Sequence, residues 1–286
     1  MTIMDETGTV MRSDKDIEQE KQERTMRAVA RMTSFYRGNP HRFCEEYLEI
    51  ELMLFQKILL YLMNINTNFM YIAARGQGKS FLIAIFCAVR CILYPGTKIC
   101  LASKTRKQAT EILEKLNAHP ISESVNLKHE IEMVTVNQSN AFVNFHNGSK
   151  IVVVTANDTA RSNRANILVV DEFRLVDKDI IDQVLRKFCT ASRHPKYLYK
   201  PEYEHLAERN KEIYLSSAFF QSHWSYEKLK TYVANMLNDN RKYFACGLPY
   251  QLSVKEGLLM RDALADEMSE SDFSEIGLVF SPIKIL

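Results

Sequence analysis

The sequence has 286 residues, of which 46% are hydrophobic and 25% charged, and its formal net charge is +2 at pH 7. These values are those of a globular protein with one large domain and room for a small appendage, and they exclude a low-complexity chain. A charge so close to zero also excludes a basic field over the whole surface, so any contact with nucleic acid must come from a local patch or a channel.

The six cysteines include no C-x-x-C pair and no Cys/His cluster at zinc spacing, which indicates neither a metal site nor a disulfide framework. The first residues lack the basic start and the apolar stretch of a secretory signal. The longest apolar stretch, 81–94, is too short to cross a bilayer and contains Arg90, so we expect a buried helix there. These features predict a cytoplasmic protein without a membrane contact.

The N-terminal part, residues 1–38, is rich in charge and has little apolar periodicity before Met26. We expect a charged, partly mobile or solvated helical lead-in there. Asn39 and Pro40 then have the residue types of an N-cap and of a first helical position. A helix is therefore predicted to start at this point, and a second one to follow over 51–63.

A glycine-rich segment, A-A-R-G-Q-G-K-S, follows the apolar run 68–72 and leads into a helical pattern. It differs from the pattern G-x-x-x-x-G-K-[ST] only at its first position, where alanine replaces glycine. A strand that passes through such a turn into a helix aims backbone N–H groups and the positive helix end at one anion. An ordinary strand-to-helix turn has a similar local pattern, so a second site element is needed. The segment predicts a phosphate-binding loop for ATP, formed by Ala73, Ala74, Arg75, Gly76, Gln77, Gly78, Lys79 and Ser80.

Within this loop, Lys79 would lie beside the β and γ phosphates, and the Ser80 hydroxyl would bind Mg²⁺.

Apolar runs and helical patterns alternate past this loop, as in an α/β fold. Asn147-Gly148 separates two of the apolar runs and is the strongest short hairpin signal. We predict a mostly parallel, doubly wound sheet with helices on both faces and an antiparallel hairpin addition. The expected strands after the loop are 98–102, 141–145, 150–155, 167–170, 211–217 and 243–247.

The run I-L-V-V-D-E supplies the second site element, because an apolar strand that ends in two acids places carboxylates at the carboxyl edge of the sheet. Asp171 would hold Mg²⁺ and its waters, and Glu172 would orient and deprotonate the attacking water. Alternatively, Asp171 and Glu172 are two solvated acids at the end of a strand, without a catalytic role. Together with the loop, the run predicts a P-loop NTPase of the catalytic-glutamate type that hydrolyses ATP.

The residues also resemble the ATPase domain of the large terminase subunit of tailed bacteriophages, the motor that packages DNA into the procapsid. That family tolerates a small residue at the start of the loop and has an arginine inside it, as Arg75 is here. The loop, the acid strand and a Ser/Thr-rich coupling motif, here Ser216-Ser217-Ala218, follow in the same order. Gln56, 23 residues before Lys79, matches a glutamine ahead of the loop. The resemblance covers roughly 39–248.

The resemblance implies roles for these residues. Gln56 would contact adenine, although it also fits as one polar residue on an amphipathic helix. Arg75 would neutralise γ-phosphate charge, or else pair with a carboxylate at the rim of the loop. Ser216 and Ser217 would sense the γ-phosphate and relay hydrolysis to the elements that grip DNA, or they would simply end a strand.

Arg161 stands where family members have an arginine proposed to reach the ATP of a neighbouring subunit. The family pattern usually has glycine after that arginine, and Ser162 stands there in this chain, so Arg164 is a competing candidate.

Phosphate contacts with DNA need little more than Lys or Arg in a channel. Solvated loop charge is the alternative for the candidate contacts, which are Lys104, Arg106, Lys107, Arg193, Lys196 and Lys200.

The expected organisation is a lead-in over 1–38, an ATPase domain over 39–250 and, over 251–286, a linker or the start of a nuclease domain. Too few residues follow for such a domain, so we expect a fragment or a truncated gene product without nuclease activity. The resemblance implies double-stranded DNA, a portal protein and a small terminase subunit as partners. It also implies a homo-oligomeric ring on the portal of the procapsid, in the host cytoplasm. The alternatives are a helicase-like remodelling ATPase and an inactive remnant that binds nucleotide.

Overall fold

The chain divides into two compact units, Met1–Asn39 and Pro40–Leu286. The element described in the first unit is α1 (Asp14–Gly38), a 25-residue helix whose apolar side chains, among them Met26 and Phe35, are half or more exposed. The computed structural model describes residues 14–74, 76–116, 118, 121–137, 140–157, 164–190, 192–217, 221–238 and 241–260.

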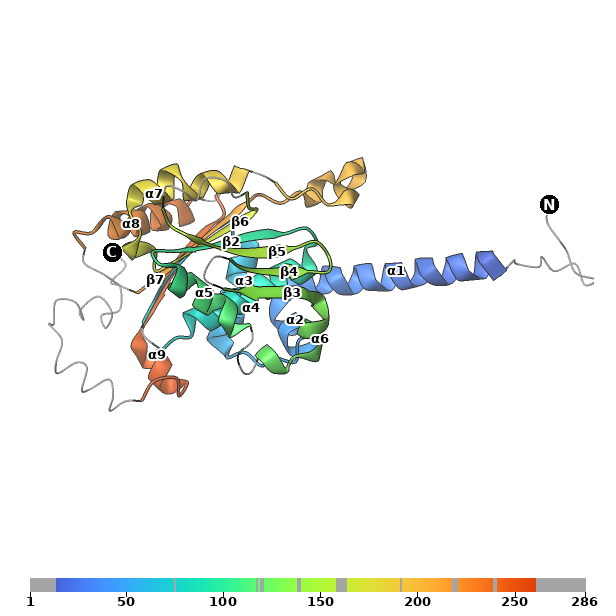
Figure 1. The fold of residues 1–286 in the computed structure, drawn as a ribbon, viewed down its shortest axis with the longest axis horizontal. Coiled ribbons are helices and arrows are strands. Elements are labelled where there is room, and N and C mark those ends of the chain that lie inside the picture. The colour runs from blue at the N-terminus through green and yellow to red at the C-terminus, as the bar shows by residue number, and fades with distance from the viewer. Residues whose placement is uncertain are drawn as a thin grey trace, which may run out of the picture. The chain divides into compact units, whose positions relative to one another are not determined.

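The second unit is built on one eight-stranded sheet with the order β3-β4-β5-β2-β6-β7-β1-β8 (Figure 1). The six strands from β5 to β8 in this order run parallel to one another. β4 runs antiparallel to both of its neighbours. The strands are β1 (Asn68–Ala73), β2 (Lys98–Ser103), β3 (Ile131–Val136), β4 (Ala141–Phe145), β5 (Lys150–Thr155), β6 (Ile167–Asp171), β7 (Lys211–Ser216) and β8 (Tyr243–Leu248).

Helices cover both faces of this sheet. In Figure 1, α7 and α8 lie over one face, and α3, α4 and α5 lie over the other. The helices of the second unit are α2 (Pro40–Glu46), α3 (Leu54–Ile65), α4 (Lys79–Leu93), α5 (Arg106–Lys115), α6 (Val125–Glu130), α7 (Lys178–Gln183), α8 (Trp224–Met236) and α9 (Tyr250–Lys255). Short 3-10 turns include η3 (Phe173–Leu175) and η4 (Leu185–Thr190), which flank α7. The doubly wound fold is therefore confirmed.

The antiparallel addition also agrees with the prediction, because Asn147-Gly148 connects β4 to β5. Gly148 has φ 80°, a conformation that glycine adopts without strain. β3 was not predicted from the sequence. Its residues are exposed or half-buried, so the apolar signal that marks a buried strand is absent there. β7 lies between β6 and β1, an order that periodicity cannot reveal.

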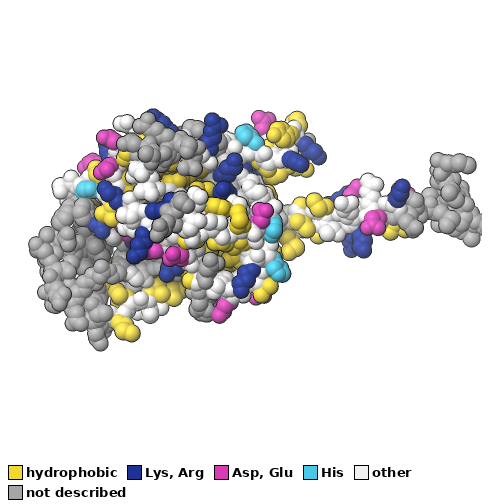
Figure 2. Space-filling view, viewed as in Figure 1, with side chains coloured by type: hydrophobic (Ala, Val, Ile, Leu, Met, Phe, Trp, Pro, Cys, Tyr) yellow, Lys and Arg dark blue, Asp and Glu magenta, His cyan; other side chains and the backbone are white. Residues whose placement is uncertain are grey.

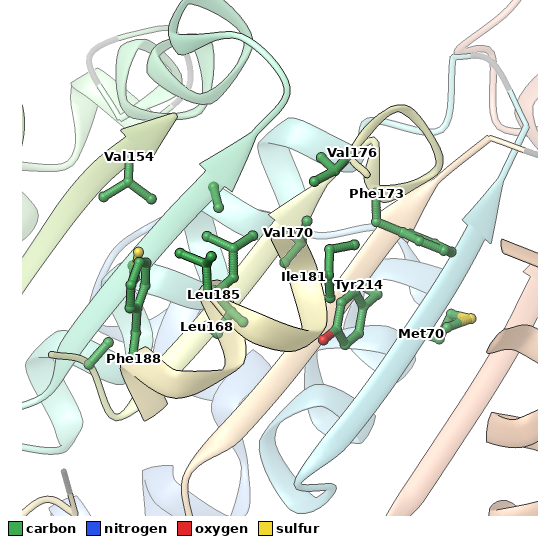
Figure 3. Close-up of a cluster of buried hydrophobic side chains, with 14 of the residues drawn as sticks. Met70, Val154, Leu168, Val170, Phe173, Val176, Ile181, Leu185, Phe188 and Tyr214 are labelled. Atoms are coloured by element: carbon green, nitrogen blue, oxygen red, sulfur yellow. The ribbon is translucent and has the colours of Figure 1, made fainter. Parts of the chain in front are cut away.

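One hydrophobic cluster joins the centre of the sheet to α7, η4 and α8 (Figure 3). Leu168 and Val170 of β6 point into it and are 0% exposed, and Ile181 and Leu185 cover them from the helical side. Burial of such side chains removes apolar surface from water, at about 1.5–3 kcal/mol each. This packing fixes β6, the strand that ends in the two acids.

The other face of the sheet is packed by α4, of which all but the first residues and Ile92 are buried. The prediction of a buried helix over 81–94 is confirmed, and it includes Arg90, which is 3% exposed. Among the described residues, none of the helices is long and apolar enough to span a membrane.

Candidate active site

The segment between β1 and α4 makes a tight passage from sheet to helix. Gly76 and Gly78 have φ of 78° and 64°, in the left-handed region that other residues rarely adopt, which explains the spacing of these glycines. Gly78 is the N-cap of α4, so the helix begins with Lys79 and Ser80. The first N–H groups of a helix have no partner within it, and its dipole is positive at this end. This turn therefore has the features of an anion-binding loop.

The side chain of Gln77 fixes the shape of this loop. It is 1% exposed, and its Oε1 accepts hydrogen bonds from the Tyr71 hydroxyl at 2.7 Å and from the Ala74 N–H at 3.0 Å. Its Nε2 donates to the carbonyl oxygens of Leu248 at 3.1 Å and Pro249 at 2.9 Å. The amide thus connects the loop to the end of β8. Because the side-chain amide is already hydrogen-bonded, the predicted contact of Gln77 with the nucleotide would come from its backbone.

The register of the sheet brings the predicted elements to one edge. Asp171, the last residue of β6, pairs with Leu215 of β7. The next residue of β7, Ser216, pairs with Ile72, one residue before the end of β1. The carboxyl ends of β6, β7 and β1 are therefore level, and the acids, the Ser216 hydroxyl and the loop after Ala73 lie at the same edge.

Glu172 and Lys79 form an ion pair across this edge. Lys79 Nζ lies 2.7 Å from Glu172 Oε1, and the two side chains are 17% and 19% exposed. The second oxygen, Oε2, accepts from the Ser216 hydroxyl at 3.1 Å and from the N–H and hydroxyl of Ser217, both at 3.4 Å. Arg174 Nε lies 3.6 Å from the same oxygen. Three residues that the sequence singled out, Lys79, Ser216 and Ser217, thus meet at the carboxylate of a fourth, Glu172.

The backbone of Glu172 is strained. It has φ 44° and ψ 48°, in the left-handed region, which costs a residue with a side chain roughly 1–2 kcal/mol. Strain of this kind persists where surrounding contacts hold it, and it collects at functional sites. The contacts of its carboxylate with α4 and β7 are such a restraint.

The two neighbouring acids have opposite pKa shifts. Burial raises the pKa of Asp171 to about 6, as does the charge of Glu172, while Lys79 and a backbone hydrogen bond offset part of the rise. Burial would also raise the pKa of Glu172, but Lys79 and the Ser216 and Ser217 hydrogen bonds outweigh it and hold that pKa below its ordinary value. Glu172 is therefore ionised at neutral pH, and Asp171 becomes protonated in mildly acidic solution.

Ser80 and Asp171 are the predicted Mg²⁺ ligands. Ser80 lies half-buried in the first turn of α4, and Asp171 is 8% exposed at the end of β6. Both offer hard oxygen atoms, and Mg²⁺ is usually bound through one or two protein oxygens together with substrate phosphates and waters. The donor set therefore fits the ion. In the described ranges, no three His, Cys, Asp or Glu side chains gather as a metal cage.

Gln56 lies next to the phosphate loop although it is distant from it in the sequence. Its side chain is 5% exposed, and its Oε1 accepts a hydrogen bond from the Met53 N–H at 2.9 Å. The position that a Cβ atom at Gly78 would occupy lies 3.7 Å from Gln56 Nε2. The start of α3 thus borders the loop, and the contact of Gln56 with adenine stays a prediction.

Three residues of the predicted site lie outside the described residues, namely Arg75, Arg161 and Ala218. The competing candidate for the arginine that reaches a neighbour, Arg164, is described and exposed just before β6. The predicted DNA contact of Arg193 is not supported, because this side chain is 7% exposed and its guanidinium bonds to Glu208 and to a backbone carbonyl.

Sequence reasoning missed two parts of the site. The first is Arg174, which lies beside the Glu172 carboxylate. Its position two residues after Glu172 indicates a place in the site only when the end of the acid strand is already known. The second is the chain after α9. A Cβ atom at Gly76 would lie 3.3 Å from the Leu258 carbonyl oxygen and 3.5 Å from Leu259 Cβ. No motif marks these leucines, which lie in the stretch predicted as a linker and border the loop.

Comparisons with solved structures find a similar fold in large terminases. The HK97 bacteriophage large terminase is similar at TM-score 0.53 and 15% identity, over 70% of this chain and 42% of that chain. The large terminase ATPase domain of Thermus phage P74-26 is similar at TM-score 0.55 and 12% identity, over 82% and 95%. The large terminase of the thermophilic bacteriophage D6E, in complex with ATP-gamma-S, is similar at 0.51 and 12%, over 79% and 52%. The fold is thus that of these ATPase domains.

The chain spans less than two thirds of the HK97 and D6E proteins. A family model described as the helicase domain of RNA cytidine acetyltransferase NAT10/TcmA matches residues 70–192, a range that includes the loop and the acid strand. A search of curated protein sequences finds no match.

The raised pKa of Asp171 predicts a pH-dependent gain in stability on its replacement. Because the folded-state pKa of about 6 lies above the ordinary 3.8, ionisation of Asp171 costs the folded state free energy. The cost is complete above pH 6 and vanishes below pH 3.8. Without Mg²⁺, Asp171→Asn should therefore raise the free energy of unfolding at about pH 8 by on the order of 3 kcal/mol.

Urea unfolding at this pH and at about pH 4 measures the effect, which should be much smaller at the lower pH. Asp179→Asn, at an exposed position in the first turn of α7, is the matched control and should change stability by about 1 kcal/mol or less at both pH values. A variant no more stable than the wild type at the higher pH would show that Asp171 is not destabilised by its burial.

Proposed function

We propose that this chain is an ATP-hydrolysing motor domain of the terminase large-subunit kind, which couples ATP hydrolysis to translocation of double-stranded DNA into a procapsid. The observation that supports this most strongly is the meeting of Lys79, at the start of α4, with Glu172, at the end of the acid strand. These are the two groups that phosphate binding and water activation require. The similarity in fold to terminase ATPase domains agrees with it.

In this proposal the loop binds the phosphates of ATP with its backbone N–H groups and with Lys79. Ser80 and Asp171 would hold Mg²⁺, which would supply charge neutralisation at the phosphates. Glu172 orients the attacking water and accepts its proton. Gln56 contacts the adenine base, a role that the position of its Nε2 atom 3.7 Å from the site of a Cβ atom at Gly78 supports.

The Lys79–Glu172 ion pair is then the resting state of the site. Phosphates of an incoming nucleotide compete with the Glu172 carboxylate for the Lys79 ammonium. Once Lys79 turns to them, the largest influence that lowers the pKa of Glu172 is lost, while its burial remains. The pKa of Glu172 rises as a result, and the carboxylate becomes a stronger base for the water at the time when substrate is present.

Ser216 and Ser217 are the proposed link between hydrolysis and movement. Ser216 ends β7, the strand between the acid strand and the loop strand, and Ser217 follows it. Both residues hydrogen-bond to Glu172 Oε2. Any rotation of the Glu172 carboxylate toward a water changes these bonds. β7 is thus placed to pass the state of the site on to the rest of the sheet. Arg75 at the γ-phosphate and Arg161 from a neighbouring subunit complete the proposed site.

The partners proposed for this motor are double-stranded DNA, a portal protein and a small terminase subunit, with a homo-oligomeric ring at the portal vertex in the host cytoplasm. The similarity in fold to large terminases supports this setting. Figure 2 shows Lys and Arg side chains in several separate groups on one face, without one continuous basic field. Such a surface suits local backbone contacts.

Hydrolysis of ATP is the first test. With Mg²⁺ and double-stranded DNA, the wild type should release phosphate. Lys79→Ala should lose ATP binding, because the ammonium no longer faces the phosphates. Glu172→Gln should keep ATP binding and lose turnover by about 10²–10⁴-fold, the size of a general-base contribution. Phosphate release and calorimetric binding measure the two effects.

The matched control is Glu227→Gln on α8, at an exposed glutamate, which should turn over ATP at the wild-type rate. If the wild type hydrolyses ATP no faster than the Lys79 and Glu172 variants with DNA and portal present, the chain is an inactive nucleotide-binding remnant and the motor proposal fails.

A helicase-like remodelling ATPase is the second candidate, favoured by the helicase-domain model that matches residues 70–192. The two functions act on different substrates. In the presence of portal and ATP, a packaging motor should displace a third strand from a DNA triplex and leave a forked duplex paired. Strand separation on the fork without triplex displacement would favour the helicase reading. Glu172→Gln, as a matched protein without turnover, should do neither.

A further inference from the structure

A cavity of about 560 Å³ opens at the amino-terminal edge of the sheet, opposite the phosphate loop. It lies where β1, β7 and β8 begin and where α3 and α4 end, and its walls include Asn64, Tyr94, Arg209, Lys211 and Lys242. The proposed motor site uses none of these residues. Its volume is within the range of about 300–1,000 Å³ that is usual for small-molecule sites.

The floor of this cavity holds a buried lysine. Lys211 is 4% exposed, and its Nζ donates hydrogen bonds to the carbonyl oxygens of Asn64 and Asn66, each at 2.7 Å. An ammonium in such a place is costly, since carbonyl oxygens compensate only part of its lost hydration. Burial lowers the pKa of Lys211 to about 7, as do the charges of Arg90 and Lys242, against the opposing effect of Glu208.

The acid in the described part of the cavity wall, Glu208, is already shared by two arginines. The Glu208 carboxylate accepts two hydrogen bonds from the Arg90 guanidinium, at 3.0 and 3.1 Å, and one from Arg193 at 3.1 Å. Arg90 and Arg193 are 3% and 7% exposed, and the Nε atoms of both are buried without a hydrogen-bond partner in the described part of the chain. The Arg90 guanidinium also stacks on Tyr94, 3.5 Å from its ring centroid. Glu208 therefore has little charge left to compensate Lys211.

Among the described residues, the charge in and behind the walls of the cavity is positive. Five cations lie in or behind its walls: Arg90, Arg193, Arg209, Lys211 and Lys242. Against them stand one carboxylate and the ends of α3 and α4, each worth roughly half a negative charge. Arg209 and Lys242 are exposed and no ion pair is described for either, so they are available to a ligand.

We propose that this cavity is an anion-binding site for phosphate groups, with Arg209, Lys211 and Lys242 as the contacting residues. An anion seated there completes the compensation of a lysine and arginines that the fold buries together. The phosphate comes from the backbone of a nucleic acid strand or from a free small anion. The site is separate from the ATP site in place and residues, so it does not depend on the proposed motor function.

The test uses the full chain with Lys79→Ala, so that the phosphate loop is impaired in every sample. Inorganic pyrophosphate is titrated by calorimetry, and a labelled single-stranded oligonucleotide by fluorescence anisotropy. Adding Arg209→Ala and Lys242→Ala should weaken binding of the probe by about ten-fold or more, because two of the three contacting cations are lost. Both positions are exposed, so the fold should persist.

The control adds Lys128→Ala and Lys187→Ala, which remove the same charge at exposed positions away from the cavity. It should change the affinity by less than about two-fold. An oligonucleotide that binds and is displaced by pyrophosphate identifies a nucleic acid as the source of the phosphate. Pyrophosphate binding alone identifies a free anion. Failure of both probes to bind, or equal weakening in the two double variants, would overturn the proposal.

Discussion

The ion pair between Lys79 and Glu172 is the interaction on which the site depends. Each side chain is less than one-fifth exposed, and at 2.7 Å each charge compensates the burial of the other. Removal of one partner of such a pair leaves an uncompensated charge at a cost of about 3–5 kcal/mol. The pair also spans β7, so it joins the loop and helix α4 to the acid strand. A nucleotide that takes Lys79 must replace this compensation, which is what phosphate oxygens provide.

The sheet places two charged centres at its opposite edges. At the carboxyl edge, the level ends of β6, β7 and β1 bring the acids, the Ser216 hydroxyl and the phosphate loop together. At the amino edge, the same β7 begins with buried Lys211. β7 thus contributes residues to both centres. A shift of β7 during hydrolysis would therefore change the position of Lys211 in the basic cavity. The closely packed cluster around Leu168 and Tyr214 holds β7 against its neighbours.

The parts that the sequence predicted are those encoded locally. Gly76, Gly78 and Lys79 define a turn and a helix start within a few residues, Asn147-Gly148 defines a hairpin, and an apolar run ending in Asp171 defines a strand end. The rest depends on contacts between distant segments. Gln77 reads as a loop residue, yet its amide anchors the loop to the end of β8. The basic cavity draws its residues from four separate stretches, so no local pattern marks it.

A crystal structure of the chain with Mg²⁺ and a non-hydrolysable ATP analogue tests the central claim most directly. Lys79 Nζ should leave Glu172 and contact the phosphates, and the freed Glu172 carboxylate should face the γ-phosphate through a water. The bond of Glu172 to the Ser216 hydroxyl should lengthen or break. A nucleotide bound away from residues 76–80, with Lys79 still 2.7 Å from Glu172, would contradict the proposal that this ion pair is the resting state of an ATP site.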